Sequence, residues 1–260
     1  LPLFTRYLHW LGQLLRGDLG FSLQYQIPVS QLLNQYIWNS FLLASVALVF
    51  YWGIGLAVGV VSALRPGSWF DHLVSVAVFA AMSFPTFFLC LLLIKWFAVD
   101  LHWLPVGGMT NTGSDESGWQ YVLQVAAHLA LPVLVLAYYS LASITRLTRS
   151  ACLSEMNKEY ILLARAKGAG EMTILLRHVL PNIRGTLLTV TALAWTSMLE
   201  GAVLTETVFS WPGICRYLTT GLFAGDTTAI MGGTLLIGVS FVLINNLTDL
   251  LVRLTDPRVR

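Results

Sequence analysis

Residues 159–182 read EYILLARAKGAGEMTILLRHVLPN, and the rest of the chain is organised around this charged stretch because long apolar runs flank it on both sides. The 260-residue chain is 56% hydrophobic and only 11% charged, with a mean hydropathy of +0.71. Average soluble proteins carry about 25% charged residues. A multi-span membrane protein is therefore expected, with residues 159–182 outside the bilayer.

Five apolar runs are long enough to span a membrane, since about 20 apolar residues cross the hydrocarbon core. They lie at about 38–64, 73–98, 122–147, 186–208 and 229–252. The expected fold is all-α and polytopic. Residues 1–36 form an N-terminal segment before the transmembrane domain, residues 37–260, and the leucines of this segment predict a short amphipathic helix that ends near Gly17.

The second run contains Pro85 in its interior, within Ser83-Phe84-Pro85-Thr86. Proline lacks a backbone donor and kinks a helix. A kinked helix that lines a passage and a static packing kink explain this residue about equally well. Pro85 is therefore a candidate pathway or gate residue.

The basic residues are distributed unequally between the two sides of the predicted membrane domain. Eleven of the 15 Lys and Arg residues fall on one side, namely Arg65, Arg146, Arg149, Lys158, Arg165, Lys167, Arg177, Arg184, Arg253, Arg258 and Arg260. The positive-inside rule places that side in the cytoplasm. The loop at about 149–184 and the C-terminus are then cytoplasmic, residues 1–36 are external, and a further span is expected before them.

The charged stretch predicts two helices separated by glycine. The first is expected at about 153–167, and Gly168 and Gly170 end it. The second begins at Glu171, carries an apolar stripe and ends at Pro181. The stripe consists of Met172, Leu175, Leu176, Val179 and Leu180. Such a hairpin either offers a knob to a cytoplasmic partner or lies on lipid headgroups.

Several motifs, far apart in the sequence, resemble one family. Ala164-Arg165-Ala166-Lys167-Gly168, with Leu180-Pro181 following so that Pro181 stands 13 residues after Gly168, resembles the EAA loop of ABC-transporter permeases. The variant YILLARAKGAG is similar to the dipeptide/oligopeptide/nickel branch. LRGDLGFSLQ (15–24), TETVFSWPGICRYL (205–218) and the terminal DPRVR agree with it. The acidic residue that names the loop is absent, and Leu162 occupies its position.

The resemblance implies a type I ABC importer permease fold, whose members usually have six spans, the first of them missing here. It implies a bacterial inner-membrane subunit that passes short peptides inward, with nickel or another small solute as the alternative. Its partners would be a second homologous permease, two cytoplasmic ATPase subunits, an extracytoplasmic solute-binding protein and membrane lipid. The loop residues that would couple to the ATPase are Tyr160, Ala164, Arg165, Ala166, Lys167, Gly168, Leu180 and Pro181.

Other kinds of function find little support in the sequence. There is no phosphate-binding Walker A pattern and no hydrolase motif, the histidines lack metal-ligand spacing, and a net charge of +2 does not favour nucleic acid. No catalytic residue, metal or cofactor is therefore expected. An ATP-independent secondary transporter would need carboxylates within the spans, and only Glu200 is well placed.

Three further candidates lie in the fourth predicted span or in the loop that follows it. Glu206 is expected close to the outer interface, where it is either hydrated or caps the external turn. The turn Trp211-Pro212-Gly213 is expected to support the external gate region. Glu200 is the deeper acid, and it is a candidate for facing the pathway or another helix.

Overall fold

The computed structural model describes residues 2–111, 113 and 117–255, without the side chains of residues 139, 196, 197, 199–201 and 255. The terminal DPRVR motif and the Glu200 side chain therefore lie outside the described residues. The described part of the chain is helical apart from turns and one isolated bridge between Phe21 and Pro28. The all-α fold predicted from the hydropathy pattern is confirmed.

The helices follow one another in a simple order. They are α1 (Leu3–Leu15), α2 (Val29–Phe50), the π-helix η1 (Tyr51–Leu56), α3 (Ala57–Leu64), α4 (Trp69–Ser83), α5 (Thr86–Leu93), the π-helix η2 (Ile94–Asp100), α6 (Trp119–Met156), α7 (Glu159–Ala166), α8 (Glu171–Ile174), the π-helix η3 (Leu175–Val179), α9 (Leu180–Val208), α10 (Ile214–Ala224) and α11 (Thr227–Thr255). Helix α1 ends just before Gly17, as its leucine spacing predicts.

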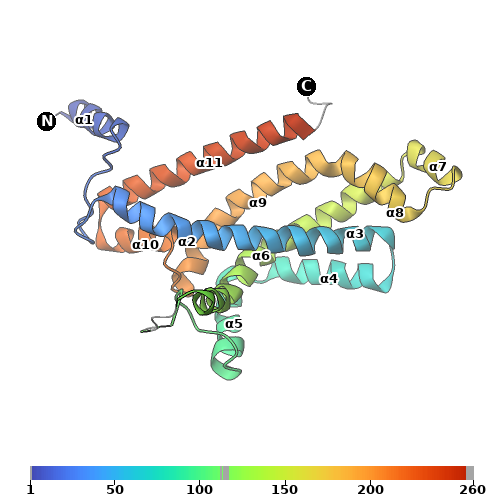
Figure 1. Ribbon diagram of the computed structural model, residues 1–260, viewed down its shortest axis with the longest axis horizontal. Coiled ribbons are helices and arrows are strands. Elements are labelled where there is room, and N and C mark those ends of the chain that lie inside the picture. The colour runs from blue at the N-terminus through green and yellow to red at the C-terminus, as the bar shows by residue number, and fades with distance from the viewer. Residues whose placement is uncertain (1, 112, 114–116, 256–260) are drawn as a thin grey trace.

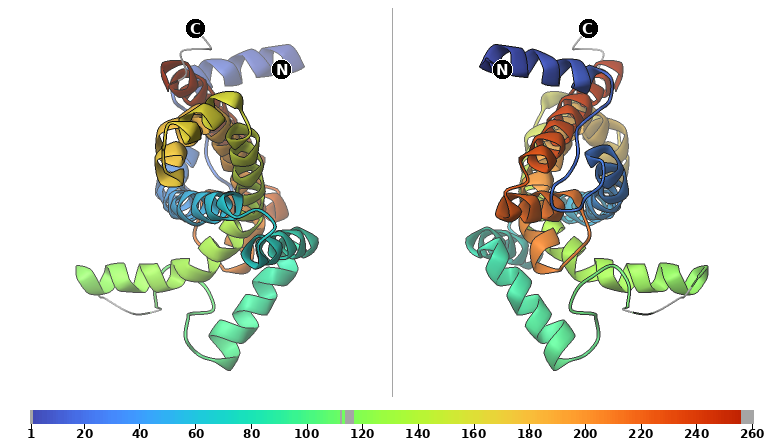
Figure 2. Two further views of the ribbon diagram at one scale, coloured as in Figure 1. Left: turned by 90° about the vertical axis from the view of Figure 1, so that its right-hand side faces the viewer. Right: turned by 90° about the vertical axis from the view of Figure 1, so that its left-hand side faces the viewer.

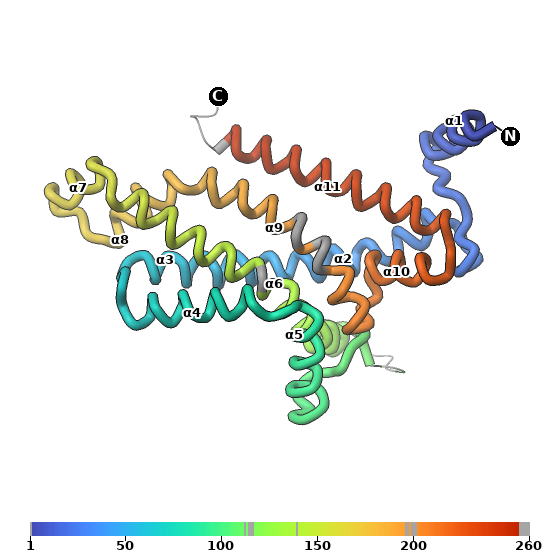
Figure 3. The backbone as a smooth tube through the Cα atoms, turned by 180° about the vertical axis from the view of Figure 1, so that it is seen from behind, coloured from blue at the N-terminus to red at the C-terminus, as the bar shows by residue number. Residues whose placement is uncertain are grey.

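The long helices run along one axis of the molecule (Figure 1). Helix α6 is central because it packs against α2, α3, α4 and α9, while α11 lies against α9. Helices α7 and α8 form one tip, and α1 and α10 lie toward the opposite end (Figure 3). Helix α5 and the beginning of α6 splay away from this bundle (Figure 2). The charged stretch therefore forms one extremity of the molecule.

Several helices are long and apolar enough to cross a membrane. They are Val29–Leu64, Trp119–Tyr138 and Thr227–Leu254, and the bent pair Trp69–Ser83 and Thr86–Asp100 is long and apolar enough to form either a broken span or a re-entrant loop. These four coincide with the first, third, fifth and second predicted spans, and α9 occupies the fourth. The first span begins at Val29, earlier than predicted, because the helix starts directly after Pro28 and continues through polar residues.

The second predicted span is not one kinked helix. Helices α4 and α5 meet at 102°. Phe84 is extended between them, with φ −86° and ψ 130°, as expected of a residue that precedes proline. Pro85 also provides no backbone donor with which to continue the helix. The sequence places this break correctly but underestimates the change of direction.

Two glycines let α3 and η1 approach α6 closely. A methyl group at Gly55 would collide with the Ile144 side chain, and one at Gly59 would come within 2.8 Å of the Thr145 carbonyl oxygen. Small residues serve this purpose in membrane helices, where close backbone approach provides much of the packing. This contact fixes α6, and with it the helical arm that leads into the charged tip.

Candidate functional site: the α7–α8 hairpin and its supports

The charged stretch forms a helical hairpin, α7–α8, between the ends of α6 and α9. The single helix predicted over 153–167 is wrong, because α6 ends at Met156 and α7 begins only at Glu159. Lys158 has an extended backbone and pairs with the Glu155 carboxylate at 2.6 Å. The chain therefore breaks at Asn157, where asparagine is a poor helix former.

Gly168 closes α7 in the way the sequence predicts. Its φ is +85°, a conformation that residues other than glycine rarely adopt. The Gly168 N–H donates to the Arg165 carbonyl at 2.9 Å, and the Ala169 N–H donates to the Ala164 carbonyl at 3.1 Å. These two bonds form a Schellman motif. Gly168 therefore sets the direction in which the chain leaves α7.

Buried apolar side chains fix the base of the hairpin. Ile161 from α7 and Ile174 from α8 are fully buried, and Leu175 and Val179 join them in the main core. Burying such side chains contributes about 1.5–3 kcal/mol each. The hairpin is therefore part of the folded core at its base rather than an independent loop.

Tyr160 links the hairpin to both neighbouring helices. Its hydroxyl contacts the Glu155 carboxylate at the end of α6 and accepts a hydrogen bond from Asn182 Nδ2 of α9 at 3.1 Å. Its ring also meets the His178 ring edge-on at 6.4 Å. Tyr160 thus holds α7 against α6 and α9, a positioning role that its place in the motif does not reveal.

The outer surface of the hairpin is more apolar than the sequence suggests. Leu162, Leu163, Met172 and Leu176 are between 55% and 61% exposed. Together with exposed Ala166, Lys167 and Gly168 they form what we call the tip surface. The predicted stripe of the second helix is split, since Leu175 and Val179 face the core while Met172 and Leu176 face outward.

The two basic residues near the turn, Arg165 and Lys167, differ in whether they form an ion pair. Arg165 binds Glu171 through two hydrogen bonds, at 2.9 and 3.1 Å, so its guanidinium ties α7 to α8. Both side chains are substantially exposed, and such a pair adds little stability. Lys167 is exposed at the turn and forms none of the ion pairs found in the described part of the chain.

Leu180 and Pro181 lie inside a continuous helical run from α8 to α9, so the prediction that Pro181 ends the second helix is wrong. The π-helix η3 ends at Val179, α9 begins at Leu180, and Pro181 occupies the first turn of α9. The wider π-helical turn accommodates a residue that lacks an N–H. In the same region, Asn182 Nδ2 donates a hydrogen bond to the His178 carbonyl at 2.6 Å. The hairpin is therefore joined to α9 without an interruption.

A buried ion pair supports the α6 arm of the hairpin. Arg149 binds Asp71 of α4 through Nε–Oδ1 at 2.5 Å and a second N–H to Oδ2 at 2.6 Å. Asp71 also accepts hydrogen bonds from the Ser62 hydroxyl of α3 and from the Gly67 N–H. This cluster, which we call the Asp71 ion pair, joins α3, α4 and α6. The sequence offers no signal that pairs residues 71 and 149.

The opposite end of the molecule is organised around the buried carboxylate of Glu206. It accepts N–H bonds from Cys215 at 2.8 Å and Arg216 at 3.0 Å, and a bond from the Ser40 hydroxyl at 2.6 Å. An acid at the beginning of α10 is favoured by the helix dipole. Of the two alternatives for Glu206, the capping of the turn is confirmed.

The Trp211-Pro212-Gly213 turn is held by the same cluster. Trp211 is fully buried and donates from Nε1 to the Asn39 carbonyl at 3.1 Å. Asn39 Nδ2 donates to the Pro212 carbonyl at 2.8 Å. The turn thus ties α9 and α10 to α2. The geometry explains a scaffold role for these residues, while their part in a gate stays a prediction.

Replacing Gly213 with alanine is expected to destabilise this end of the molecule. The new methyl group would collide with the Glu206 carboxyl group, which three hydrogen bonds hold in place. We expect a loss of about 1–3 kcal/mol, typical of overpacking, measured as a lower unfolding temperature in detergent. Gly238→Ala is the control, because nothing lies within 4 Å of its added methyl group. Equal unfolding temperatures for the two variants would contradict this account.

The LRGDLGFSLQ motif forms a strap that binds the start of α11. Asp226 accepts a hydrogen bond from the Ser22 hydroxyl at 2.6 Å and from the Gln24 N–H at 3.1 Å, and it caps α11 through the Ala229 N–H at 3.0 Å. Tyr25 packs its ring against Tyr217 of α10. The motif is therefore explained by one buried carboxylate 204 residues away from Ser22.

The strap is expected to weaken at acid pH. Burial alone raises the pKa of Asp226, but hydrogen bonds led by that from Ser22 outweigh it and hold the pKa below its ordinary value. A lowered pKa stabilises the fold above the ordinary carboxyl pKa, about 3.9, and this contribution is lost as the pH falls through the lowered value. The difference in unfolding temperature between the wild type and Asp226→Asn should hold from pH 7 to about 5 and shrink below about 4. A difference that grows on acidification would contradict this.

The comparisons with known proteins agree with this geometry. Residues 55–260 match the family described as "Binding-protein-dependent transport system inner membrane component". The chain belongs to this family, and it is a multi-pass inner-membrane permease subunit of an ABC importer rather than an enzyme. Such importers work with ATPase and solute-binding partners.

Relatives with high similarity carry peptide-transport names. The chain is 37% identical to the di/tripeptide transport system permease protein DppB of Pseudomonas aeruginosa, with all of the chain and 81% of that protein aligned. It is 34% identical to the dipeptide permease DppB of Escherichia coli K12, with 100% and 81% aligned. It is also 34% identical to the oligopeptide permease AppB of Bacillus subtilis, with 99% and 81% aligned.

Solved structures share the fold at low sequence identity. A chain of the inward-facing MetNI methionine ABC transporter superposes with a TM-score of 0.67 at 20% identity, covering 87% of this chain and 97% of that one. This likeness supports the type I importer fold inferred from the sequence motifs.

Proposed function

We propose that this chain forms half of the translocation pathway of a peptide importer and that the α7–α8 hairpin transmits ATP-driven movement to it. The observation that carries the proposal is the hairpin itself. It protrudes as an extremity of the molecule, it is rooted in the core by Ile161 and Ile174, and it joins α6 directly to α9. A push on the tip surface therefore moves two long helices together, a rigid-body switch of a common kind.

The tip surface is the proposed docking site for an ATPase subunit. Four exposed apolar side chains lie on the helices that precede and follow the Gly168 turn, and Lys167 adds a cation. Apolar contact at the centre with charge at the rim is typical of specific interfaces. Tyr160, Leu180 and Pro181 act from the base by positioning the hairpin, and Arg165 acts through its bond to Glu171.

The remaining arrangement follows from charge and family. Residues of the loop at about 149–184 and the C-terminus face the cytoplasm, as the distribution of Lys and Arg favours. Residues 1–36 are external, and residues 37–260 form the transmembrane domain. A second homologous permease completes the pathway, two ATPase subunits bind on the cytoplasmic side, an external binding protein delivers the substrate, and lipid covers the apolar periphery.

Short peptides are the proposed substrates because the relatives named above are dipeptide, tripeptide or oligopeptide permeases. The test is uptake into proteoliposomes that contain this chain, its partner permease and both ATPases, with the binding protein added outside. We expect uptake of a labelled dipeptide that requires ATP. Uptake of nickel but not of dipeptide would favour the alternative solute. Uptake by this chain alone, driven by an ion gradient, would overturn the proposal.

A further inference from the structure

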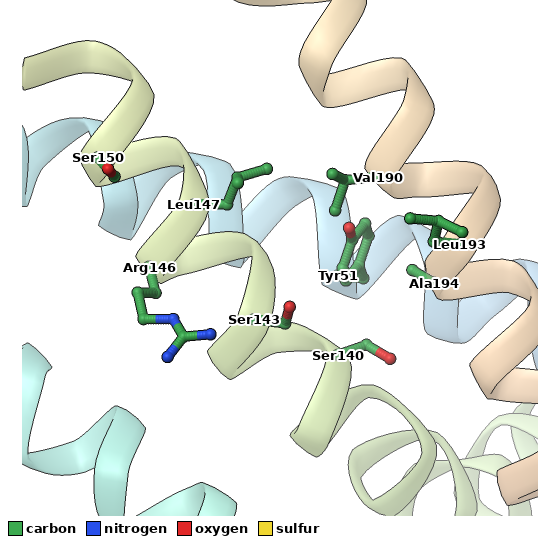
Figure 4. A pocket seen from close by; sticks show the side chains of 9 residues that line it. All are labelled: Tyr51, Ser140, Ser143, Arg146, Leu147, Ser150, Val190, Leu193 and Ala194. Carbon is green, nitrogen blue, oxygen red and sulfur yellow. The ribbon is translucent and has the colours of Figure 1, made fainter. Parts of the chain in front are cut away.

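A cavity of about 420 Å³ lies between the two helices that the hairpin joins. One wall comes from α6, which contributes Leu147 and a row of polar residues, Ser140, Ser143, Arg146 and Ser150. The other wall is apolar and comes from α9, including Val190 and Ala194, and Tyr51 of η1 lies behind them (Figure 4). The row begins at buried Ser140 and ends at exposed Arg146 and Ser150, so a ligand can reach the cavity from this end.

The charges around this cavity are not balanced. Arg146 lines it and forms none of the ion pairs found in the described part of the chain. Arg149, about one helical turn away, is by contrast neutralised by Asp71. Arg146 is exposed, so it lies at the open edge of the cavity, where an entering anion can reach it. Arg146 therefore presents a guanidinium to whatever enters the cavity.

Tyr51 adds a second polar group that lacks a good partner. Its side chain is fully buried, and its hydroxyl forms no hydrogen bond of good geometry with the described residues, although Thr191 lies near it. A buried hydroxyl of this kind is normally satisfied. The row of α6 from Ser140 to Ser150 extends over about 15 Å at 1.5 Å per residue. An extended dipeptide spans about 7 Å, so the row is long enough to hold one.

We propose that this cavity is a transit site for peptides and that Arg146 binds their terminal carboxylate while the serine and tyrosine hydroxyls meet their backbone groups. The inference rests on the proposed function, because it names the part of the substrate that the permease recognises. The cavity lies between the two arms of the hairpin, so movement of the tip surface changes the width of the site. Arg146 releases the carboxylate when the arms separate.

The test compares a dipeptide with its C-terminal amide in the reconstituted importer described above. For each permease, the uptake of the free-acid dipeptide is divided by the uptake of the amide. The wild type and the variant use the same binding protein, so any preference of that protein affects both ratios equally. We expect Arg146→Gln to lower this ratio about tenfold, which corresponds to one charge-assisted hydrogen bond. Uptake of the amide should stay within about twofold of wild type.

The control is Arg253→Gln, an exposed cation on α11 that does not line the cavity; its uptake ratio should equal that of the wild type. An equal loss of both peptides, or no loss, in Arg146→Gln overturns the inference. If that variant does not copurify with the ATPases, Arg146→Lys decides instead. The uptake ratio of Arg146→Lys should fall about threefold, since lysine lacks the bidentate fork, and an unchanged ratio overturns the inference. A wild type that takes up neither peptide would instead refute the proposed function.

Discussion

Gly168→Thr is expected to uncouple the permease from its ATPase subunits. The residue has φ +85°, so a β-branched side chain is strained there even though no atom lies within 4 Å of the new Cβ. The left-handed conformation costs a non-glycine residue about 1–2 kcal/mol, which lowers the population of the native turn about 5- to 30-fold. The tip surface then turns away from the proposed ATPase partner. We expect copurified ATPase and ATP-dependent uptake to fall about 5- to 30-fold.

Gly170→Thr is the matched control for this experiment. Gly170 has φ −73° and ψ 155°, an extended conformation that threonine adopts readily. As at Gly168, no atom lies within 4 Å of an added Cβ. Gly170 also occupies the N-cap of α8, a position where threonine is about as good as glycine. Copurification should therefore be unchanged. If the two threonine variants retain the ATPases equally, the turn at Gly168 is not what presents the hairpin.

Asp71→Asn is expected to have the largest effect on stability. The change keeps the shape of the side chain but leaves the Arg149 guanidinium without its anion, while Asp71 itself is only 4% exposed. Breaking a buried ion pair from one side costs about 3–5 kcal/mol, and the partial exposure of Arg149 places the cost near about 3 kcal/mol. The unfolding temperature in detergent should fall by about 6–12 °C.

Asp100→Asn removes an ion pair of the same chemical kind in an exposed place. Lys95 and Asp100 are 2.6 Å apart, but their side chains are 66% and 46% exposed. Such surface pairs contribute about 0–1 kcal/mol. The unfolding temperature of this variant should lie within about 4 °C of the wild type. A similar loss in both variants would show that burial does not determine the strength of the Asp71 ion pair.

Much of the architecture could be read from the order of residues, because hydropathy and glycine act locally. Apolar length locates the spans, Pro85 marks a break and Gly168 ends a helix. The errors at Asn157 and Pro181 arise where tertiary contacts override local preference. A short extended link separates α6 from α7, and a π-helical turn carries the chain through Pro181.

The contacts that hold the hairpin and the strap in place could not be predicted from the sequence. Asp71 and Arg149, or Ser22 and Asp226, are brought together only by the packing of distant helices. The tip surface could not be predicted either. The sequence shows one apolar stripe, whereas in the structure Leu175 faces the core and Leu176 faces outward at the base of the hairpin. The sequence does not distinguish Arg146 from Arg149; the structure does, because Arg149 pairs with Asp71.

The most direct test of the central claim is a cross-link from the tip surface to an ATPase subunit. The native cysteines Cys90, Cys152 and Cys215 are buried, so a thiol-reactive benzophenone will label an introduced exposed cysteine selectively. Ala166→Cys lies on the tip surface, and Ala224→Cys, the matched control, lies at the end of α10 toward the opposite end of the molecule. We expect light-dependent cross-linking to the ATPase from position 166 and none from position 224. Cross-linking from both positions, or only from position 224, would contradict the account.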